Sequence, residues 1–126
     1  MKLRNAAIIA AFLSVTVASS AVEAGDAAKG KRVYAKCKAC HTIKKGGKNK
    51  LGPNLYGIIG RKAAGVEGFK YSNAMKNAGI AWTPDNLDKY LTKPKKFIPK
   101  NRMAFPGLRK KQQRDDVIAF MATFHE

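Results

Sequence analysis

The sequence predicts an all-α protein with three to five short helices. Apolar residues recur every three or four positions near both ends of the chain, as they do on the buried face of a helix. No segment alternates apolar and polar residues in the way that a half-buried strand does. Because the apolar stripe of the last helix needs a partner, we expect the N- and C-terminal helices to pack together.

The N-terminal segment 1–24 is predicted to be a cleaved secretory signal peptide, followed by a single domain over 25–126. Two basic residues precede the apolar run 6–18, and in the segment 19–24 that follows it the residues are small at the positions that a signal peptidase reads. The run is shorter than the roughly 20 residues of a membrane helix, which disfavours an uncleaved anchor. Cleavage after Ala21 is the nearest alternative.

The formal net charge of the 126-residue chain is +17, which indicates acidic partners. Nucleic acid would match the sign, but the sequence contains no nucleic-acid-binding motif. Anionic lipid surfaces or an acidic patch on another protein match both the charge and export from the cytoplasm. We therefore expect a monomer that docks on acidic surfaces, without nucleic acid and without embedding in the membrane.

The first helix is predicted to start after Asp26, a residue type that commonly caps helices. Its buried face follows from residues at positions i, i+3, i+4 and i+7, namely Gly30, Val33, Tyr34 and Cys37. A glycine on this face lowers helix stability, so we expect another element to approach closely there.

The pentapeptide after this helix has the pattern C-x-x-C-H, formed by Cys37, Cys40 and His41. The pattern is typical of covalent haem attachment, because two thiols at this spacing reach two vinyl groups while the histidine becomes an axial ligand. A closed zinc site usually needs four ligands, and the chain has two cysteines and two histidines. A redox dithiol is expected beside a strand-helix-strand pattern, which is missing. We therefore expect one covalently bound haem c.

The glycine-rich stretch 42–57 is predicted to be a loop. A ligating histidine usually donates its second ring proton to a fixed acceptor, which sets the tautomer. A carbonyl group in the Gly52-Pro53 turn is a candidate for this acceptor.

Two further helices are predicted in the middle of the chain. Ser72 can cap a short helix over 73–78, which ends at Gly79. The next helix starts at Pro84, which follows a threonine, and ends before Pro94. Its inner face is predicted to consist of Leu87, Tyr90 and Leu91.

The segment 94–107 contains three prolines and is predicted to run extended across the surface. Met103 lies in its middle. Methionines on helices, such as Met75 and Met121, are usually flexible core residues, whereas Met103 lies on a proline-stiffened loop. It is the best candidate for a thioether ligand of the iron.

The last helix is predicted over 110–124 and is amphipathic. Its apolar face is formed by Val117, Phe120, Met121 and Phe124, and the polar residues expected off that face are Lys110, Lys111, Gln113 and Arg114.

Together these residues resemble the small class I c-type cytochromes, which include mitochondrial-type cytochrome c and bacterial periplasmic cytochrome c2. The similar positions span nearly all of 25–126 and include C-K-A-C-H, Gly52-Pro53-Asn54-Leu55, Gly60-Arg61-Lys62, Trp82, Tyr90-Leu91, Pro94-Lys95-Lys96, Met103 and Phe105. The resemblance implies helices wrapped round one covalently attached haem.

The resemblance also implies residue roles. Cys37 and Cys40 would carry the thioethers, and His41 and Met103 would be the axial ligands of the iron. The haem propionates would be bound by Arg61, Tyr71 and Trp82, and the pocket would be completed by Pro53, Tyr90 and Phe105. Partner docking would use Lys36, Lys95, Lys96, Arg102 and Arg109. The sequence departs from mitochondrial forms at Ala63, Met75 and Asn101, which affects the expected hydrogen-bond network around the haem.

The predicted function is one-electron transfer without catalysis. The resemblance implies a quinol:cytochrome c reductase as donor and a terminal oxidase or photosynthetic reaction centre as acceptor. Two strong axial ligands leave no open position for a substrate. One alternative is a haem enzyme or gas sensor in which Met103 is displaced. Another is a dedicated electron acceptor of a dehydrogenase, as in methanol oxidation.

Overall fold

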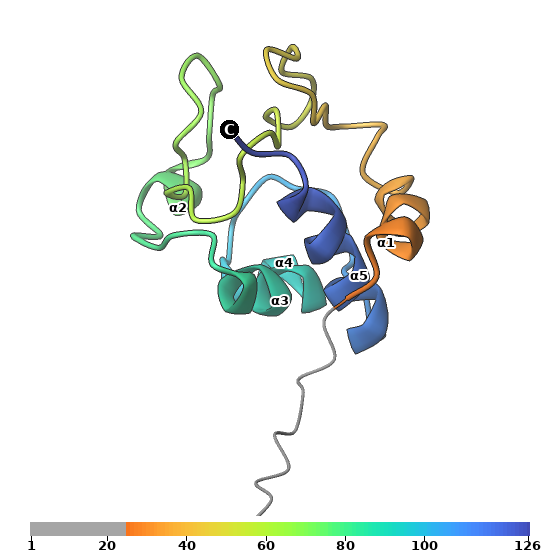
Figure 1. Cartoon of the computed structure of the whole chain (residues 1–126). Coiled ribbons are helices and arrows are strands. Elements are labelled where there is room, and N and C mark those ends of the chain that lie inside the picture. The colour runs from red at the N-terminus through yellow and green to blue at the C-terminus, as the bar shows by residue number, and fades with distance from the viewer. Residues whose placement is uncertain (1–24) are drawn as a thin grey trace, which may run out of the picture.

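A computed structural model describes residues 25–126, and these residues form five helices (Figure 1). The helices are α1 (Ala27–Tyr34), α2 (Asn73–Lys76), α3 (Pro84–Thr92), α4 (Pro94–Phe97) and α5 (Lys111–Ala122). Within this range the β structure is limited to an isolated antiparallel bridge between Lys62 and Ala81. The prediction of an all-α fold is confirmed, and the predicted signal peptide 1–24 lies outside the described residues.

Helices α1 and α5 pack side by side, as predicted (Figure 1). Gly30 makes the close approach possible, since a Cβ atom at this position would overlap the carbonyl oxygen of Asp116. Beside it, the ring centroids of Tyr34 and Phe120 lie 5.3 Å apart, and Val117 is 1% exposed. The glycine on the buried face therefore reflects contact between two helix backbones.

The start of α1 is bonded to α5 through two aspartates. The Asp26 side chain accepts a hydrogen bond from the Lys29 N–H at 3.1 Å, which is the predicted N-cap. The Asp26 N–H donates in turn to Asp116 Oδ1 at 2.7 Å. The bond from the Asp26 N–H, together with one from Gln112 Nε2 at 2.8 Å, lowers the pKa of Asp116, because both stabilise its ionised form.

Arg114 corrects the prediction for α5. The sequence pattern assigned it to the exposed side, but it is buried. Its Nε donates to Asp88 Oδ1 of α3 at 2.7 Å, and its Nη1 donates to the carbonyl groups of Leu108 and Arg109 at 2.8 and 3.0 Å. Burial of the guanidinium is tolerated because a carboxylate and two carbonyl groups bind it.

The segment 94–107 was predicted to be extended throughout, and this is wrong for its first four residues, which form α4. Proline fits the first turn of a helix, where its missing N–H is not needed. From Ile98 to Gly107 the chain has neither helix nor strand. The helices at Ser72 and in the C-terminal region are shorter than predicted, and Ser72 caps α2 as expected.

Among residues 25–126, no helix combines the length and apolar character that crossing a membrane would require.

Candidate cofactor site

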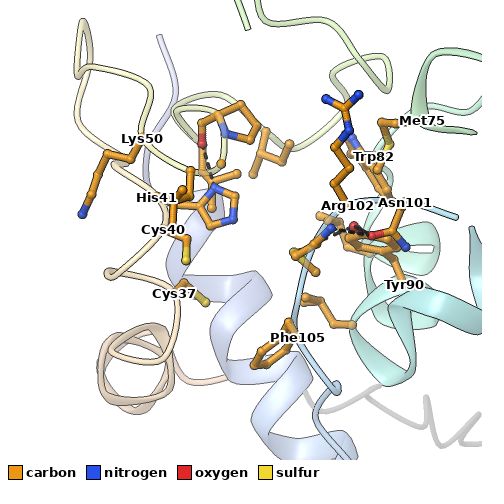
Figure 2. A pocket seen from close by; sticks show the side chains of 18 of the residues that line it. Cys37, Cys40, His41, Lys50, Met75, Trp82, Tyr90, Asn101, Arg102 and Phe105 are labelled. Atoms are coloured by element: carbon orange, nitrogen blue, oxygen red, sulfur yellow. Dashed lines mark hydrogen bonds between the residues drawn. The ribbon is translucent and has the colours of Figure 1, made fainter. Parts of the chain in front are cut away.

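A cavity of ≈ 660 Å³ lies between the loops and helices. One side is formed by residues 37–55, here called the histidine wall, and the opposite side by residues 90–108, called the methionine wall (Figure 2). The volume is typical of sites that hold small molecules and cofactors, about 300–1,000 Å³. Most side chains that line it are apolar.

The C-x-x-C-H segment forms a tight turn directly after α1. The Cys37 carbonyl accepts hydrogen bonds from the N–H groups of Cys40, at 3.1 Å, and His41, at 2.9 Å. The turn brings both sulfurs and the imidazole to the cavity (Figure 2). Both thiols are free, and burial raises the pKa of the Cys37 thiol to about 11.

The orientation of the His41 ring is fixed on two sides. Its Nδ1 lies 2.7 Å from the Pro53 carbonyl oxygen, which can only accept, so Nδ1 carries the proton and Nε2 has a free lone pair. A Cβ atom at Gly52 would overlap the ring. Burial lowers the pKa of His41, which favours the neutral ring that a metal ligand requires.

Met103 belongs to the methionine wall and lines the same cavity. Its N–H donates to Asn101 Oδ1 at 2.9 Å, and its sulfur lies 3.8 Å from the hydroxyl group of Tyr90. Burial raises the pKa of Tyr90 to about 12, so its hydroxyl group remains a donor at neutral pH. Phe105 also lines the cavity (Figure 2).

Three residues expected near the propionates line the cavity between the two walls, namely Arg61, Tyr71 and Trp82. Trp82 packs on Tyr90 with ring centroids 4.8 Å apart. The Tyr71 hydroxyl group accepts a hydrogen bond from the Val66 N–H at 3.1 Å. Arg61 donates from Nη1 and Nη2 to the carbonyl groups of Tyr56 and Asn54, at 3.0 and 3.1 Å.

The hydrogen bonding of Arg61 Nε indicates whether the site fits a haem. It is buried and, among the described residues, has no hydrogen-bond partner. A buried cationic donor of this kind is stabilised by an anionic acceptor, which a haem propionate would supply. Two thiols, a neutral imidazole, a thioether and a mostly apolar cavity form the donor set expected for a c-type haem. The residues therefore fit this cofactor.

The basic residues predicted for docking are all exposed, but they differ in position. Lys36 and Arg102 line the cavity, whereas Lys95 and Lys96 lie on α4 and Arg109 precedes α5. The Lys95 Nζ donates to the Asn101 carbonyl group, and Arg102 Nη1 donates to the Lys70 carbonyl group at 3.1 Å.

The sequence prediction missed three residues at the cavity opening, namely Lys50, Leu51 and Lys70. Leu51 is 84% exposed. The signal available in the sequence was the position of Lys50 and Leu51 directly before the Gly52-Pro53 turn, which contacts the histidine ring.

Short helices surround an apolar cavity, and one wall of the cavity carries two thiols and a histidine nitrogen with a free lone pair. These features define the class of proteins that carry one covalently attached haem. Residues 27–125 match the family model described as "Cytochrome c". The chain belongs to the cytochrome c family.

Relatives from bacteria cover most of the chain. A cytochrome c2 from Agrobacterium tumefaciens (strain II Chrys) is 50% identical over 100 residues, which are 77% of this chain and 90% of the relative. A cytochrome c2 from Rhodomicrobium vannielii is 47% identical over 107 residues, 85% of this chain and 86% of the relative. The solved structure of cytochrome cH from Methylobacterium extorquens has a TM-score of 0.75 and 42% identity, and covers 79% of this chain and 99% of that protein.

The resemblance that the sequence indicated is therefore confirmed. The chain carries one covalently attached haem c and acts as a haem-based electron carrier.

Proposed function

We propose that this chain is a periplasmic one-electron carrier in which Cys37 and Cys40 hold the haem, and His41 and Met103 are the axial ligands of its iron. One observation carries the proposal: the free Nε2 of His41 and the thioether of Met103 line the same cavity from opposite walls. When bound, the haem supplies the exchange of one electron between Fe(III) and Fe(II).

The two ligands have different tasks. His41 is a neutral donor whose direction is fixed by the hydrogen bond to Pro53. A methionine thioether favours the reduced state relative to a second nitrogen ligand, and so raises the reduction potential. With both His41 and Met103 bound, the iron would have no open position for a substrate, which supports electron transfer without catalysis.

The remaining cavity residues hold and cover the cofactor. We assign Arg61, Tyr71 and Trp82 to the propionates, and the unpartnered Nε of Arg61 supports this assignment. Tyr90 lies beside the sulfur of Met103 and keeps its proton. Phe105, which also lines the cavity, would shield the edge of a bound haem from water.

The partners are proposed to be acidic surfaces of membrane redox complexes. The donor would be a quinol:cytochrome c reductase, and the acceptor a terminal oxidase or a photosynthetic reaction centre. The proposed docking residues are Lys36, Lys95, Lys96, Arg102 and Arg109, together with Lys50 and Lys70 at the cavity opening. Opposite charges speed the encounter and fix its orientation, and salt weakens this attraction.

The ligand assignment is tested by absorption spectra and a redox titration of the matured protein, with and without carbon monoxide. We expect a low-spin haem with the weak long-wavelength sulfur-to-iron band and no shift with carbon monoxide. Met103→Ala should lose the band, lower the potential and bind carbon monoxide. Met75→Ala is the matched control, because Met75 also lines the cavity but should retain the band.

A high-spin wild-type spectrum that shifts with carbon monoxide would contradict the carrier and favour a haem enzyme or sensor.

The periplasmic location rests on the predicted signal peptide 1–24 and is tested by cell fractionation with N-terminal sequencing. A mature N-terminus at Gly25 in the periplasmic fraction is expected, and a full-length cytoplasmic chain would overturn it.

A further inference from the structure

The loop that carries Met103 has little backbone support of its own. From Arg102 to Gly107, no main-chain N–H donates to another main-chain carbonyl group, and hydrogen bonding of this kind resumes at Leu108, whose N–H donates to the Leu91 carbonyl at 2.7 Å. The Met103 N–H is instead bound by the side chain of Asn101. A loop without main-chain pairing is free to move unless side chains hold it.

Asn101 is buried, with 3% of its surface exposed, and its amide group connects three parts of the methionine wall. Its Nδ2 donates to the carbonyl groups of Pro94 at 3.0 Å and Ile98 at 2.7 Å. Its Oδ1 accepts from the Met103 N–H at 2.9 Å and faces the Tyr90 hydroxyl group at 3.5 Å (Figure 2). All four hydrogen-bonding positions of the amide are used, and the surrounding donors and acceptors fix which end is the oxygen.

The Tyr90 hydroxyl group has one proton and two acceptors within reach. These are Asn101 Oδ1 at 3.5 Å and Met103 Sδ at 3.8 Å. A hydroxyl group donates in one direction at a time, so Asn101 competes with the sulfur for this proton. Tyr90 therefore connects the Asn101 amide to the Met103 sulfur within the methionine wall.

We propose that Asn101 is the positioning residue of the methionine wall, which holds the Met103 thioether at the iron. The inference rests on the proposed function, in which Met103 is the second axial ligand. Asn101 does not touch the iron in this proposal, and it acts through Met103.

The test compares Asn101→Ala with Asn54→Ala, each in the matured, haem-carrying protein. Asn54 is a matched control because its side-chain amide makes three hydrogen bonds, compared with four for Asn101, and lies on the histidine wall. Loss of the Asn101 amide should shift the balance between bound and released Met103 about tenfold towards release, as expected for one or two lost hydrogen bonds. We expect a weaker sulfur-to-iron band and faster carbon monoxide binding in Asn101→Ala, and an unchanged band in Asn54→Ala.

A second readout is independent of the haem spectrum. The Met103 N–H has Asn101 Oδ1 as its partner, so its hydrogen exchange should become faster in Asn101→Ala and remain slow in Asn54→Ala. If Asn101→Ala does not fold, Asn101→Thr retains a small polar group that cannot reach all four partners, and it should weaken the band partially.

The outcomes distinguish failure of the Asn101 role from failure of the Met103 ligand assignment. If wild type has the band and both Asn101 variants keep its full strength with unchanged carbon monoxide binding, the positioning role is overturned while the ligand assignment stands. If wild type lacks the band, the assignment of Met103 fails and this inference fails with it.

Discussion

The two walls of the cavity are held in place by different means. On the histidine wall, His41 is fixed by neighbours within twelve residues. The Cys37 carbonyl accepts from its main-chain N–H, and the Pro53 carbonyl and the close backbone of Gly52 hold its ring. On the methionine wall, Met103 is held by side chains, because Asn101 and Tyr90 supply its hydrogen-bond partners. A wall fixed by local backbone geometry tolerates loss of a side chain better than a wall fixed by a side-chain network.

The difference has a consequence for electron transfer. A carrier must keep the same coordination in both redox states, and the less firmly held ligand decides whether it does. In the proposed function the less firmly held ligand is Met103, on the methionine wall, where the loop from Ile98 to Gly107 has no helix or strand. Substitutions on the two walls should therefore separate global stability from ligand retention.

The largest effect is expected for Gly52→Ala on the histidine wall. The added Cβ atom would overlap the His41 ring, and ring and turn are both tightly held, so relief requires displacement of one of them. We expect a loss of about 3 kcal/mol in unfolding free energy, measured by denaturant titration.

The matched control for this substitution is Gly46→Ala in the same loop. Gly46 has φ +70°, and a Cβ atom there would have no neighbouring atom within 4 Å. The alanine variant therefore has backbone strain of about 1 kcal/mol but no clash. Equal losses in both variants would show that contact with the ring is unimportant.

The histidine wall was largely predictable from the sequence. The spacing of C-x-x-C-H determines a turn, and the acceptor for His41 lies twelve residues away in the predicted Gly52-Pro53 turn. The contact of the terminal helices also followed from local patterns, since Gly30 and the apolar stripe of α5 indicate a close packing partner.

The methionine wall was predictable only in part, for a physical reason. The sequence pointed to Met103, but it gave no sign that Asn101 binds Pro94, Ile98 and Met103 at once, because these partners come together only in the folded loop. Arg114 was misassigned for the same reason. Helical spacing cannot indicate that Asp88 of α3 lies opposite it.

The second-largest effect is expected for Arg114→Leu, which removes the connection between α5, α3 and the end of the methionine wall. Asp88 would lose its partner, and the carbonyl groups of Leu108 and Arg109 would lose their donor. We expect a loss of about 2 kcal/mol in unfolding free energy, because Asp88 is partly exposed and can be hydrated. Arg114→Lys should recover only part of this loss, since an ammonium group cannot reproduce three directed bonds.

A smaller effect is expected for Asn54→Ala. Its Nδ2 donates to Thr42 Oγ1 at 2.7 Å and to the Lys44 carbonyl at 2.9 Å, and its Oδ1 accepts from the Tyr56 N–H at 2.8 Å. Since the site is partly exposed, water replaces some of these bonds, and we expect a loss of about 1 kcal/mol in denaturant titration. A weakening of the sulfur-to-iron band in Asn54→Ala as large as that in Asn101→Ala would contradict the difference between the two walls.

The smallest effect is expected for Lys45→Ala, at the outer surface of the histidine wall. Its Nζ lies 2.7 Å from Glu126 Oε2, but the two side chains are 67% and 76% exposed. Exposed pairs of this kind contribute little, because water and salt screen the attraction and both side chains lose freedom. We expect an unchanged midpoint of denaturant unfolding at physiological salt, and also at high salt. A clearly lower unfolding midpoint in Lys45→Ala that returns to the wild-type value at high salt would show instead that Glu126 stabilises the histidine wall through this ion pair. Local backbone geometry alone would then not account for the rigidity of that wall.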